Sequence, residues 1–219
     1  MERAVVLLSG GMDSTVCLAW AMQQFDEVAA IGFDYGQRHR VELEAAERIA
    51  DKAGVPFELR SVGTMTGSAL TDHTVEVRGD GGHRDLPNTM TPGRNGIFLF
   101  HALNAAIPFG ARHLVTGICL ADEAGFPDCR EDFRLGMERV LSVAVEEPIR
   151  VHAPLMHLNK AATLGLAREL GALDLLAHSH TCYEGKRPAC GRCTACQARL
   201  AGFAAVGLED PIPYLSTAA

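Results

Sequence analysis

The feature that most constrains this chain is a pair of adjacent glycines between two apolar segments near its beginning. Residues 4–8 are apolar throughout, as in a buried parallel strand, and residues 15–22 can continue as a helix. The connection between them is Ser9-Gly10-Gly11-Met12-Asp13-Ser14. Glycines at such a turn let backbone N–H groups approach an anion, and the start of the following helix offers unpaired donors and the positive end of its dipole. We therefore predict a phosphate-binding loop at this position.

Two further properties of this loop indicate a nucleotide site rather than an ordinary strand–turn–helix corner. No Gly-Lys-Ser/Thr follows, so the loop is not of the lysine-bearing Walker type. The carboxylate of Asp13 lies beside the hydroxyls of Ser9 and Ser14, and a carboxylate next to a phosphate is favourable when Mg²⁺ binds between them. The residues expected to contact ATP are Leu8, Ser9, Gly10, Gly11, Met12, Asp13, Ser14, Thr15, Val16, Cys17 and Leu18.

Apolar runs alternate with segments of helical periodicity along most of the chain. The runs after the first one cover residues 28–33, 57–62, 113–118 and 149–151. This alternation predicts an α/β protein with a Rossmann-like, doubly wound parallel sheet. We expect residues 1–177 to form the nucleotide-binding domain, with residues 63–95 as a lid insertion. Residues 178–219 are expected to form a small metal-binding segment packed on it.

Three aspartates follow strand ends and are candidates for ligand contacts. Ligands of parallel sheets bind beyond the carboxyl ends of the strands, so Asp34 and Asp122 are expected on the same rim as the loop. Asp34 is equally well explained as a cap for the next helix. Asp128 precedes Glu131 by three residues, a capping-box pattern that makes it a predicted helix cap. Asp122 is therefore the better candidate for a polar ligand contact.

Two cationic residues stand where helices are expected to start. Arg94 precedes the apolar run from Ile97, and Lys160 begins a helix that Asn159 should cap. A positive side chain at a helix start opposes the dipole, which favours an anionic ligand near it. Asn95 is the predicted cap of the helix after Arg94, and a solvated side chain explains Lys160 equally well.

The composition limits the classes of function. The chain has 219 residues, 47% of them hydrophobic, and a formal net charge of −7. This excludes a disordered chain and argues against sequence-independent binding to a nucleic-acid backbone. No apolar stretch of 18 residues occurs, so we expect a cytoplasmic protein that binds neither membranes nor nucleic acid directly.

Four of the seven cysteines are crowded into fifteen residues. The spacing Cys182-x7-Cys190-x2-Cys193-x2-Cys196 suits a tetrahedral Zn²⁺ ion with four thiolates, which is a structural site. An iron–sulfur cluster is the rival interpretation. A nucleic-acid-binding zinc ribbon is the non-enzyme interpretation, which the acidic charge disfavours. The remaining three lack such crowding: Cys17 and Cys119 are expected in the core, and Cys129 stays undecided.

Taken together and in order, these motifs resemble the 7-cyano-7-deazaguanine synthase family, and the loop resembles that of the ATP-pyrophosphatase group. Two departures stand out: Phe126 replaces a usual tyrosine, and His180 replaces a frequent tryptophan. The matching residues are Ser9-Gly10-Gly11-Met12-Asp13-Ser14, Phe33-Asp34-Tyr35-Gly36-Gln37-Arg38-His39, Pro92-Gly93-Arg94-Asn95, Pro127-Asp128-Cys129-Arg130, Lys160-Ala161, Cys182-Tyr183-Glu184-Gly185, Cys190, Cys193 and Cys196.

The resemblance implies a ligase that converts 7-carboxy-7-deazaguanine, ammonium and ATP into the nitrile for queuosine biosynthesis. The acid would be adenylated, ammonia would displace AMP to give the amide, and a second adenylation would activate the amide oxygen. On this view Arg94 and Lys160 neutralise phosphate charge, and Asp13 binds Mg²⁺ beside pyrophosphate. Asp122 and Asp128 accept N–H groups of the guanine-like ring. The cysteine cluster is then expected to hold zinc.

Two alternatives remain at the level of sequence. A tRNA thiolation enzyme shares the loop but needs a basic surface or an RNA-binding domain, and a catalytically silent ATP- and zinc-binding protein would release no product. The nearly all-apolar helix at residues 97–107 predicts additional cover, from a homodimer partner or from burial within one subunit.

Overall fold

The computed structural model describes residues 1–78, 80, 82, 86–120 and 126–215. Strands and helices alternate through most of this length, as the apolar runs predicted. In chain order the elements are β1 (Arg3–Leu7), α1 (Met12–Gln24), β2 (Glu27–Asp34), α2 (Val41–Ala53), β3 (Phe57–Ser61), α3 (Arg94–Phe109), β4 (His113–Val115), η3 (Pro127–Cys129), α4 (Glu131–Val145), β5 (Arg150–His152), α5 (Lys160–Glu169), α6 (Leu173–Leu176) and α7 (Thr194–Ala205).

The five strands form one parallel sheet in the order β3-β2-β1-β4-β5. The chain leaves β1 toward one edge and returns for β4 on its other side, so β1 and β4 flank the topological switch point of a doubly wound sheet. The predicted fold class is confirmed. Because a ligand binds beyond the strands at such a switch point, the loop after β1 and the segment after β4 are placed to share a site.

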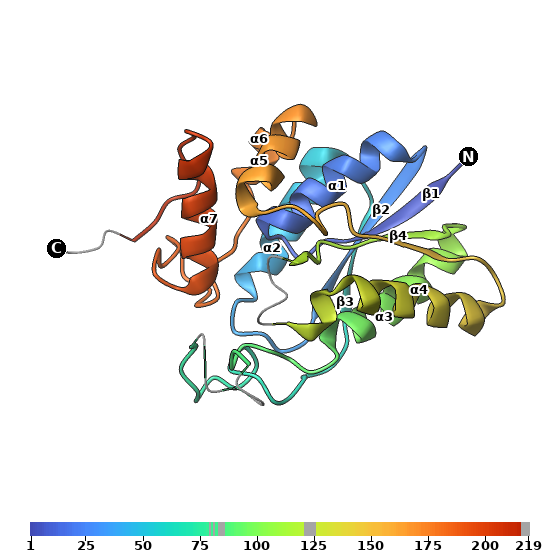
Figure 1. Cartoon of the computed structure of the whole chain (residues 1–219), viewed down its shortest axis with the longest axis horizontal. Coiled ribbons are helices and arrows are strands. Elements are labelled where there is room, and N and C mark those ends of the chain that lie inside the picture. Colours follow the sequence, from blue (N-terminus) through green and yellow to red (C-terminus); the bar gives the residue numbers. More distant parts are fainter. Residues whose placement is uncertain (79, 81, 83–85, 121–125, 216–219) are drawn as a thin grey trace.

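Two apolar layers cover the sheet because alternate residues of its central strands point to opposite faces. Ala4 and Val6 belong to an apolar cluster with residues of α1, α2, α5 and α7, whereas Val5 belongs to a second cluster with residues of α3 and α4. Figure 1 shows α1, α2, α5 and α6 on one side of the sheet, with α3 and α4 on the other. The burial of Cys17 and Cys119 in the first of these layers confirms the prediction that both are core residues.

The fourth strand is shorter than predicted, ending at Val115 rather than Ile118. The reason is the close approach of Gly117 to the start of α1. A Cβ added at Gly117 would lie 3.3 Å from the backbone nitrogen of Ser14 and 3.4 Å from the carbonyl carbon of Asp13. Residues 116–118 therefore leave the sheet to line the loop, and a larger side chain would push the two apart.

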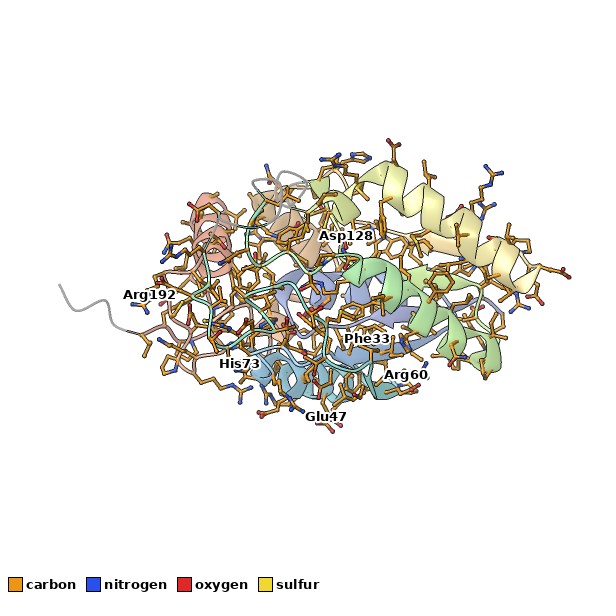
Figure 2. The ribbon with its side chains drawn as sticks, turned by 90° about the horizontal axis from the view of Figure 1, so that it is seen from below. Phe33, Glu47, Arg60, His73, Asp128 and Arg192 are labelled. Carbon is orange, nitrogen blue, oxygen red and sulfur yellow. The ribbon has the colours of Figure 1, made fainter. Side chains whose placement is uncertain are left out.

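Two helix-cap predictions are wrong because the capping contacts cross between elements. Asn95 is the second residue of α3, which begins at Arg94 after Gly93. Asp128 lies in η3 and does not cap α4, whose N-terminal flanking residue is Arg130. Its carboxylate instead accepts a hydrogen bond from the backbone N–H of Asn95, at 3.1 Å. Figure 2 shows Asp128 beside the start of α3.

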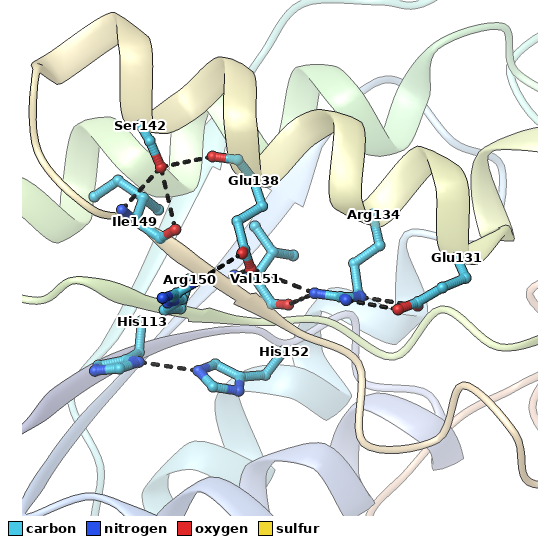
Figure 3. Close-up of polar contacts among 9 residues, drawn as sticks. All are labelled: His113, Glu131, Arg134, Glu138, Ser142, Ile149, Arg150, Val151 and His152. Carbon is cyan, nitrogen blue, oxygen red and sulfur yellow. Dashed lines mark hydrogen bonds and ion pairs between the residues drawn. The ribbon is translucent and has the colours of Figure 1, made fainter.

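Side chains of α4 complete the hydrogen bonding of the edge strand β5. Glu138 accepts from the N–H of Val151 at 2.9 Å, and Arg134 donates to the Val151 carbonyl at 2.6 Å. One turn further along, Ser142 bonds both backbone groups of Ile149. These three residues are spaced by four and share one face of α4 (Figure 3). Because exposed edge strands can pair with other chains, this helix protects the sheet edge.

A histidine pair lies under the same part of the sheet, next to Trp20 and Phe25. His113 Nδ1 and His152 Nε2 are 2.9 Å apart (Figure 3), and the rings of Phe25 and His113 are separated by 4.8 Å. Burial, followed by the charge of His113, lowers the pKa of His152. His152 is therefore neutral in the folded protein at neutral pH.

This pair gives the protein an acid-sensitive component of stability. The folded-state pKa of His152 lies below its unfolded value of about 6.5, so the unfolded chain binds the proton first as pH falls. We expect the free energy of unfolding to decrease from about pH 6.5 downward, and the His152→Gln variant to show a weaker decrease. Urea denaturation at pH 7.5 and pH 5.5 measures this difference. The exposed His73, changed to Gln, provides the control, and an equal pH response of His152→Gln and wild type would contradict the prediction.

Two long segments outside the sheet lie at the carboxyl ends of its strands. These are the connection between β3 and α3, and the C-terminal part from residue 178 (Figure 1). The connection packs onto the protein through buried Ser68, Leu70, Thr89 and Thr91. Within the described ranges, no helix is long and apolar enough to cross a membrane.

Candidate active site

The glycine loop after β1 is held in shape by its own hydroxyls. Ser9 Oγ and Ser14 Oγ are 3.0 Å apart, and the Ser14 hydroxyl donates to the Gly11 carbonyl at 3.1 Å. Helix α1 begins at Met12, earlier than predicted, so Met12, Asp13 and Ser14 form its first turn. Their backbone N–H groups have no partner within the helix, which makes this turn suitable for binding an anion.

Gly10 brings the loop into direct contact with the start of α2. Its φ of +89° is in the left-handed region, and an added Cβ would lie 2.1 Å from the Glu42 carbonyl oxygen. No other residue fits at this point without displacing α2 or the loop. The glycine therefore fixes the position of the first turn of α2 relative to the phosphate-binding loop.

Asp13 and Lys160 form an ion pair across the site. The Nζ of Lys160 is 2.6 Å from Asp13 Oδ2, and the two side chains are 21% and 26% exposed. Lys160 is the first residue of α5, and Asn159 caps that helix by accepting from Ala162 N at 2.9 Å, as predicted. The carboxylate and the ammonium group that the sequence singled out thus lie side by side, although 147 residues separate them.

Arg94 is the first residue of α3, one residue before the predicted cap Asn95, and its guanidinium lies against Tyr35. It donates to the Tyr35 hydroxyl at 3.3 Å, and its Cζ lies 5.8 Å from the centre of that ring. Burial opposes the charge, but Tyr35, Tyr183 and Asp128 raise the pKa of Arg94 above its usual value. Burial also raises the pKa of Tyr35 to about 12. A permanent positive charge on Arg94 therefore faces a neutral phenol.

These groups line one cavity of about 450 Å³, a volume typical of small-molecule sites. Its walls come from the loop, the segments after β2 and β4, the starts of α3 and α5, and the C-terminal segment. They include Leu8, Ser9, Gly11, Met12, Asp13, Ser14, Phe33, Tyr35, His39, Glu42, Leu70, Arg94, Asn95, Phe98, Gly117, Phe126, Cys129, Lys160, His180, Tyr183 and Arg199.

The structure separates the predicted site residues into several groups. Asp13, Arg94 and Lys160 line the cavity, whereas Val16, Cys17 and Leu18 are buried in the core. Asp122 lies outside the described residues. Asp128 is not among the residues that line the cavity, although Asn95, whose backbone it holds, is. Asp34 stabilises its own turn by accepting from the Gly36 N–H and pairing with Arg40.

Sequence reasoning did not assign His39, Glu42, Tyr183 or Arg199 to the site. His39 ends a stretch that matches the family motif, but no role was assigned to it there, and Glu42 lies in the first turn of a helix, where acidic residues are common. Arg199 did carry a signal, because it interrupts an otherwise mostly small and apolar helix. A buried charge in such a helix requires a partner.

The four clustered cysteines meet in space. Their sulfur atoms all lie within 4.8 Å of one another, and those of Cys190 and Cys196 are 3.9 Å apart. A tetrahedral ion with metal–sulfur bonds of about 2.3 Å requires sulfur separations of about 3.8 Å. Backbone N–H groups of Arg192 and Cys193 donate to the Cys190 sulfur, at 3.5 and 3.3 Å. The cluster therefore fits a metal ion bound by four sulfurs.

Comparisons with known proteins agree with this arrangement. The sequence profile of the family described as queuosine biosynthesis protein QueC matches residues 3–207. The chain is 49% identical over 215 residues to the 7-cyano-7-deazaguanine synthase of Laribacter hongkongensis, with 96% of this chain and 94% of the relative covered. It is 48% identical over 219 residues to that of Chromobacterium violaceum, at 96% and 93% coverage. Among solved structures, NMN synthetase from Francisella tularensis matches with a TM-score of 0.50 over 99% of this chain and 79% of that chain, at 11% identity.

The sheet order, the glycine loop at the switch point and this last similarity define a Rossmann-like α/β fold with a doubly wound parallel sheet. The family profile and the two relatives identify it more narrowly. The chain belongs to the QueC family of queuosine biosynthesis proteins.

Proposed function

We propose that this protein is an ATP-dependent ligase that converts 7-carboxy-7-deazaguanine and ammonium into 7-cyano-7-deazaguanine. The observation that carries the proposal is the similarity to relatives named for this product over 96% of the chain. The cavity supports it, because a loop suited to phosphate and three charged side chains surround a space large enough for a nucleotide fragment and a bicyclic ring.

The loop and the charged residues would have different roles in acyl activation. The first turn of α1 would hold the pyrophosphate end of ATP with its backbone N–H groups. Arg94 and Lys160 would stabilise the negative charge that develops as the substrate carboxylate attacks the α-phosphate. Asp13 would then exchange part of its contact with Lys160 for Mg²⁺ bound to the phosphates, and that ion supplies charge neutralisation when present.

The ring of the deazapurine would lie against the apolar part of the cavity, which includes Leu70, Phe98 and Phe126. Asp128 would act on this substrate through Asn95, since its carboxylate and carbonyl hold the Asn95 backbone and side chain. Asp122 keeps the role of a candidate acceptor for the ring N–H groups. We further propose that residues 63–95 cover the ring as a lid.

One assay tests the proposal. The protein is mixed with ATP, ammonium and 7-carboxy-7-deazaguanine, and pyrophosphate release and nitrile mass are followed together. We expect pyrophosphate release that depends on the acid and a nitrile product. Folded, metal-loaded protein that forms no nitrile would contradict the proposed reaction, and sulfur transfer to tRNA would support the thiolation alternative instead.

For the cysteine cluster we propose one structural Zn²⁺ ion bound by Cys182, Cys190, Cys193 and Cys196. The apolar cluster around these residues is small, with Ala189 and Ile212 as its other buried members. We therefore expect a strong chelator to remove the metal and to unfold the C-terminal segment while the sheet remains. Metal analysis and hydrogen exchange of residues 182–214 measure this. Iron instead of zinc, or unchanged exchange after metal loss, would contradict the prediction.

We also propose a homodimer through the outer face of α3. Ile97 and Phe100 are 40% and 46% exposed there and are three residues apart, so they lie on one face of the helix. Sedimentation equilibrium tests the dimer. We further propose that the protein acts on small-molecule substrates in the cytoplasm and does not bind nucleic acid directly.

A further inference from the structure

The proposed reaction requires a proton acceptor that the roles assigned above do not include. Nitrogen enters as ammonium with four protons and ends as a nitrile with none. Lys160 and Arg94 are positively charged and cannot accept protons, and Asp13 is bound to Lys160. General bases in enzymes are most often histidines within hydrogen-bond reach of the substrate. This inference rests on the proposed function and concerns the same cavity.

His39 is a buried histidine in the wall of that cavity, with a distinct partner on one ring nitrogen. Its side chain is 6% exposed, and its Nε2 lies 3.3 Å from Glu42 Oε1 and 3.5 Å from the Tyr35 hydroxyl. Its Nδ1 is buried and has no hydrogen-bond partner in the described part of the chain. A buried polar atom without a partner is unfavourable unless a ligand or water supplies one.

Glu42 selects the tautomer that makes His39 a base. Its Oε1 also accepts the side-chain N–H of Gln37, at 3.4 Å. A carboxylate accepts a proton-bearing Nε2, and this leaves the lone pair of the neutral ring on Nδ1. In the same way, a carboxylate bound to one ring nitrogen of the catalytic histidine of hydrolases sets the orientation and tautomer of that ring.

The position of His39 is fixed by packing on both sides. The start of α2 is pressed against the phosphate-binding loop through Gly10, as described above. On the other side, a Cβ at Gly185 would lie 3.0 Å from the Cα of His39, so the C-terminal segment packs directly on its backbone. The titratable groups facing the ring are Tyr35, Glu42 and Tyr183, with Arg94 bound to Tyr35. The ring is thus held between the loop and the C-terminal segment.

We propose that His39 is the general base of the amide-forming step and that Glu42 is its positioning residue. His39 Nδ1 takes one proton from ammonium, and the lone pair of the resulting ammonia forms a C–N bond with the acyl carbon of the adenylate. The acyl C–O bond to AMP then breaks with its electron pair on the phosphate oxygen, AMP leaves, and the second nitrogen proton passes to solvent to give the amide. The two remaining protons pass to solvent after the amide oxygen has displaced pyrophosphate from a second ATP, as AMP departs and the C≡N bond forms.

The test separates proton removal from adenylation. Three rates are measured for wild type and His39→Gln at pH 7: acid-dependent exchange of labelled pyrophosphate into ATP, amide formation with ammonium, and hydroxamate formation with hydroxylamine. Hydroxylamine is largely unprotonated at this pH and needs no base before it attacks. We expect His39→Gln to lose about 10²–10⁴-fold in amide formation. Pyrophosphate exchange and hydroxamate formation should stay within a few-fold of wild type.

Three further measurements sharpen the result. The amide rate of His39→Gln should rise with pH in proportion to free ammonia. Glu42→Gln should reduce the same step by a smaller factor, and it provides the second variant if His39→Gln does not fold. His157→Gln, at an exposed histidine outside the proposed lid and the cavity wall, should match wild type in all three rates.

Two outcomes would overturn the role of His39. Equal losses in all three rates would make it a structural residue, and an unchanged amide rate at pH 7 would exclude it as the base. Wild-type protein without acid-dependent pyrophosphate exchange would overturn the proposed function, and with it the role of His39.

Discussion

Replacing Lys160 by methionine is expected to slow acid-dependent pyrophosphate release by roughly 10²–10³-fold, because it removes a positive charge aimed at the reacting phosphate. Methionine keeps most of the length of the side chain and loses the ammonium group. The loss of rate has a second cause. Without Lys160, the Asp13 carboxylate 2.6 Å away becomes an uncompensated negative charge in a partly buried site, which repels the phosphates of ATP.

Lys52 provides the matched control for this prediction. It lies in the last turn of α2 and is exposed, so Lys52→Met changes the same functional group away from the cavity. Steady-state measurements of kcat and KM for ATP distinguish the contributions: loss of phosphate binding raises KM, and loss of transition-state stabilisation lowers kcat. A Lys160→Met protein with wild-type kcat/KM would show that Lys160 serves only to neutralise Asp13.

Replacing Arg199 by methionine is expected to lower the free energy of unfolding by about 3–5 kcal/mol, the cost of leaving one member of a buried ion pair unpaired. Arg199 is 1% exposed and binds Asp210 through two bonds, of 2.7 and 2.9 Å. Its remaining donors reach the Ser179 hydroxyl at 2.6 Å and the Leu176 carbonyl at 3.2 Å. This one guanidinium thus joins α7 to the chain before the cysteine cluster and to the residues after α7.

The thermal midpoint should fall by roughly 6–20 °C in Arg199→Met, given about 2–4 °C per kcal/mol for a chain of this size. The exposed Arg192, changed to Met, is the control; Figure 2 shows it at the outer end of the C-terminal segment. A double variant, Arg199→Met with Asp210→Leu, should regain part of the loss because no buried charge is left unpaired. If the double variant lost as much free energy of unfolding as Arg199→Met and Asp210→Leu lose together, the ion-pair explanation would be wrong.

The two predictions concern different contacts around the cavity. Lys160 and Asp13 join α5 to the phosphate-binding loop, whereas Arg199 holds the segment that supplies His180 and Tyr183 to the cavity wall. A further bond from the His180 N–H to the Gly10 carbonyl, at 2.8 Å, links that segment to the loop itself. A metal ion held by the cysteine cluster would therefore stabilise a part of the cavity wall.

Local patterns in the sequence were sufficient to predict several elements. The strands were recognisable because a parallel sheet buries both faces of its strands, which makes each one a continuous apolar run. The loop was recognisable because only glycine tolerates the left-handed conformation found at Gly10. Cys190, Cys193 and Cys196 were recognisable because short fixed spacings bring sulfur atoms together within one turn of chain. In each case the information lies within a few residues.

Only the tertiary structure decided the contacts between residues that are far apart in the sequence or that no local sequence pattern marks. The pairing of Asp13 with Lys160 required the crossover that places α5 beside the loop. Asp128 has a sequence that fits a cap for α4, but folding places its carboxylate against α3, where a helix start with unpaired N–H groups competes for it. His39 and Glu42 acquire a shared hydrogen bond and a cavity wall only when Gly10 presses the loop onto α2. The sequence by itself determined the fold class, the position of the glycine loop and the clustering of the cysteines, because those follow from local periodicity and spacing. The partners of the charged side chains depend on packing, which local patterns do not encode.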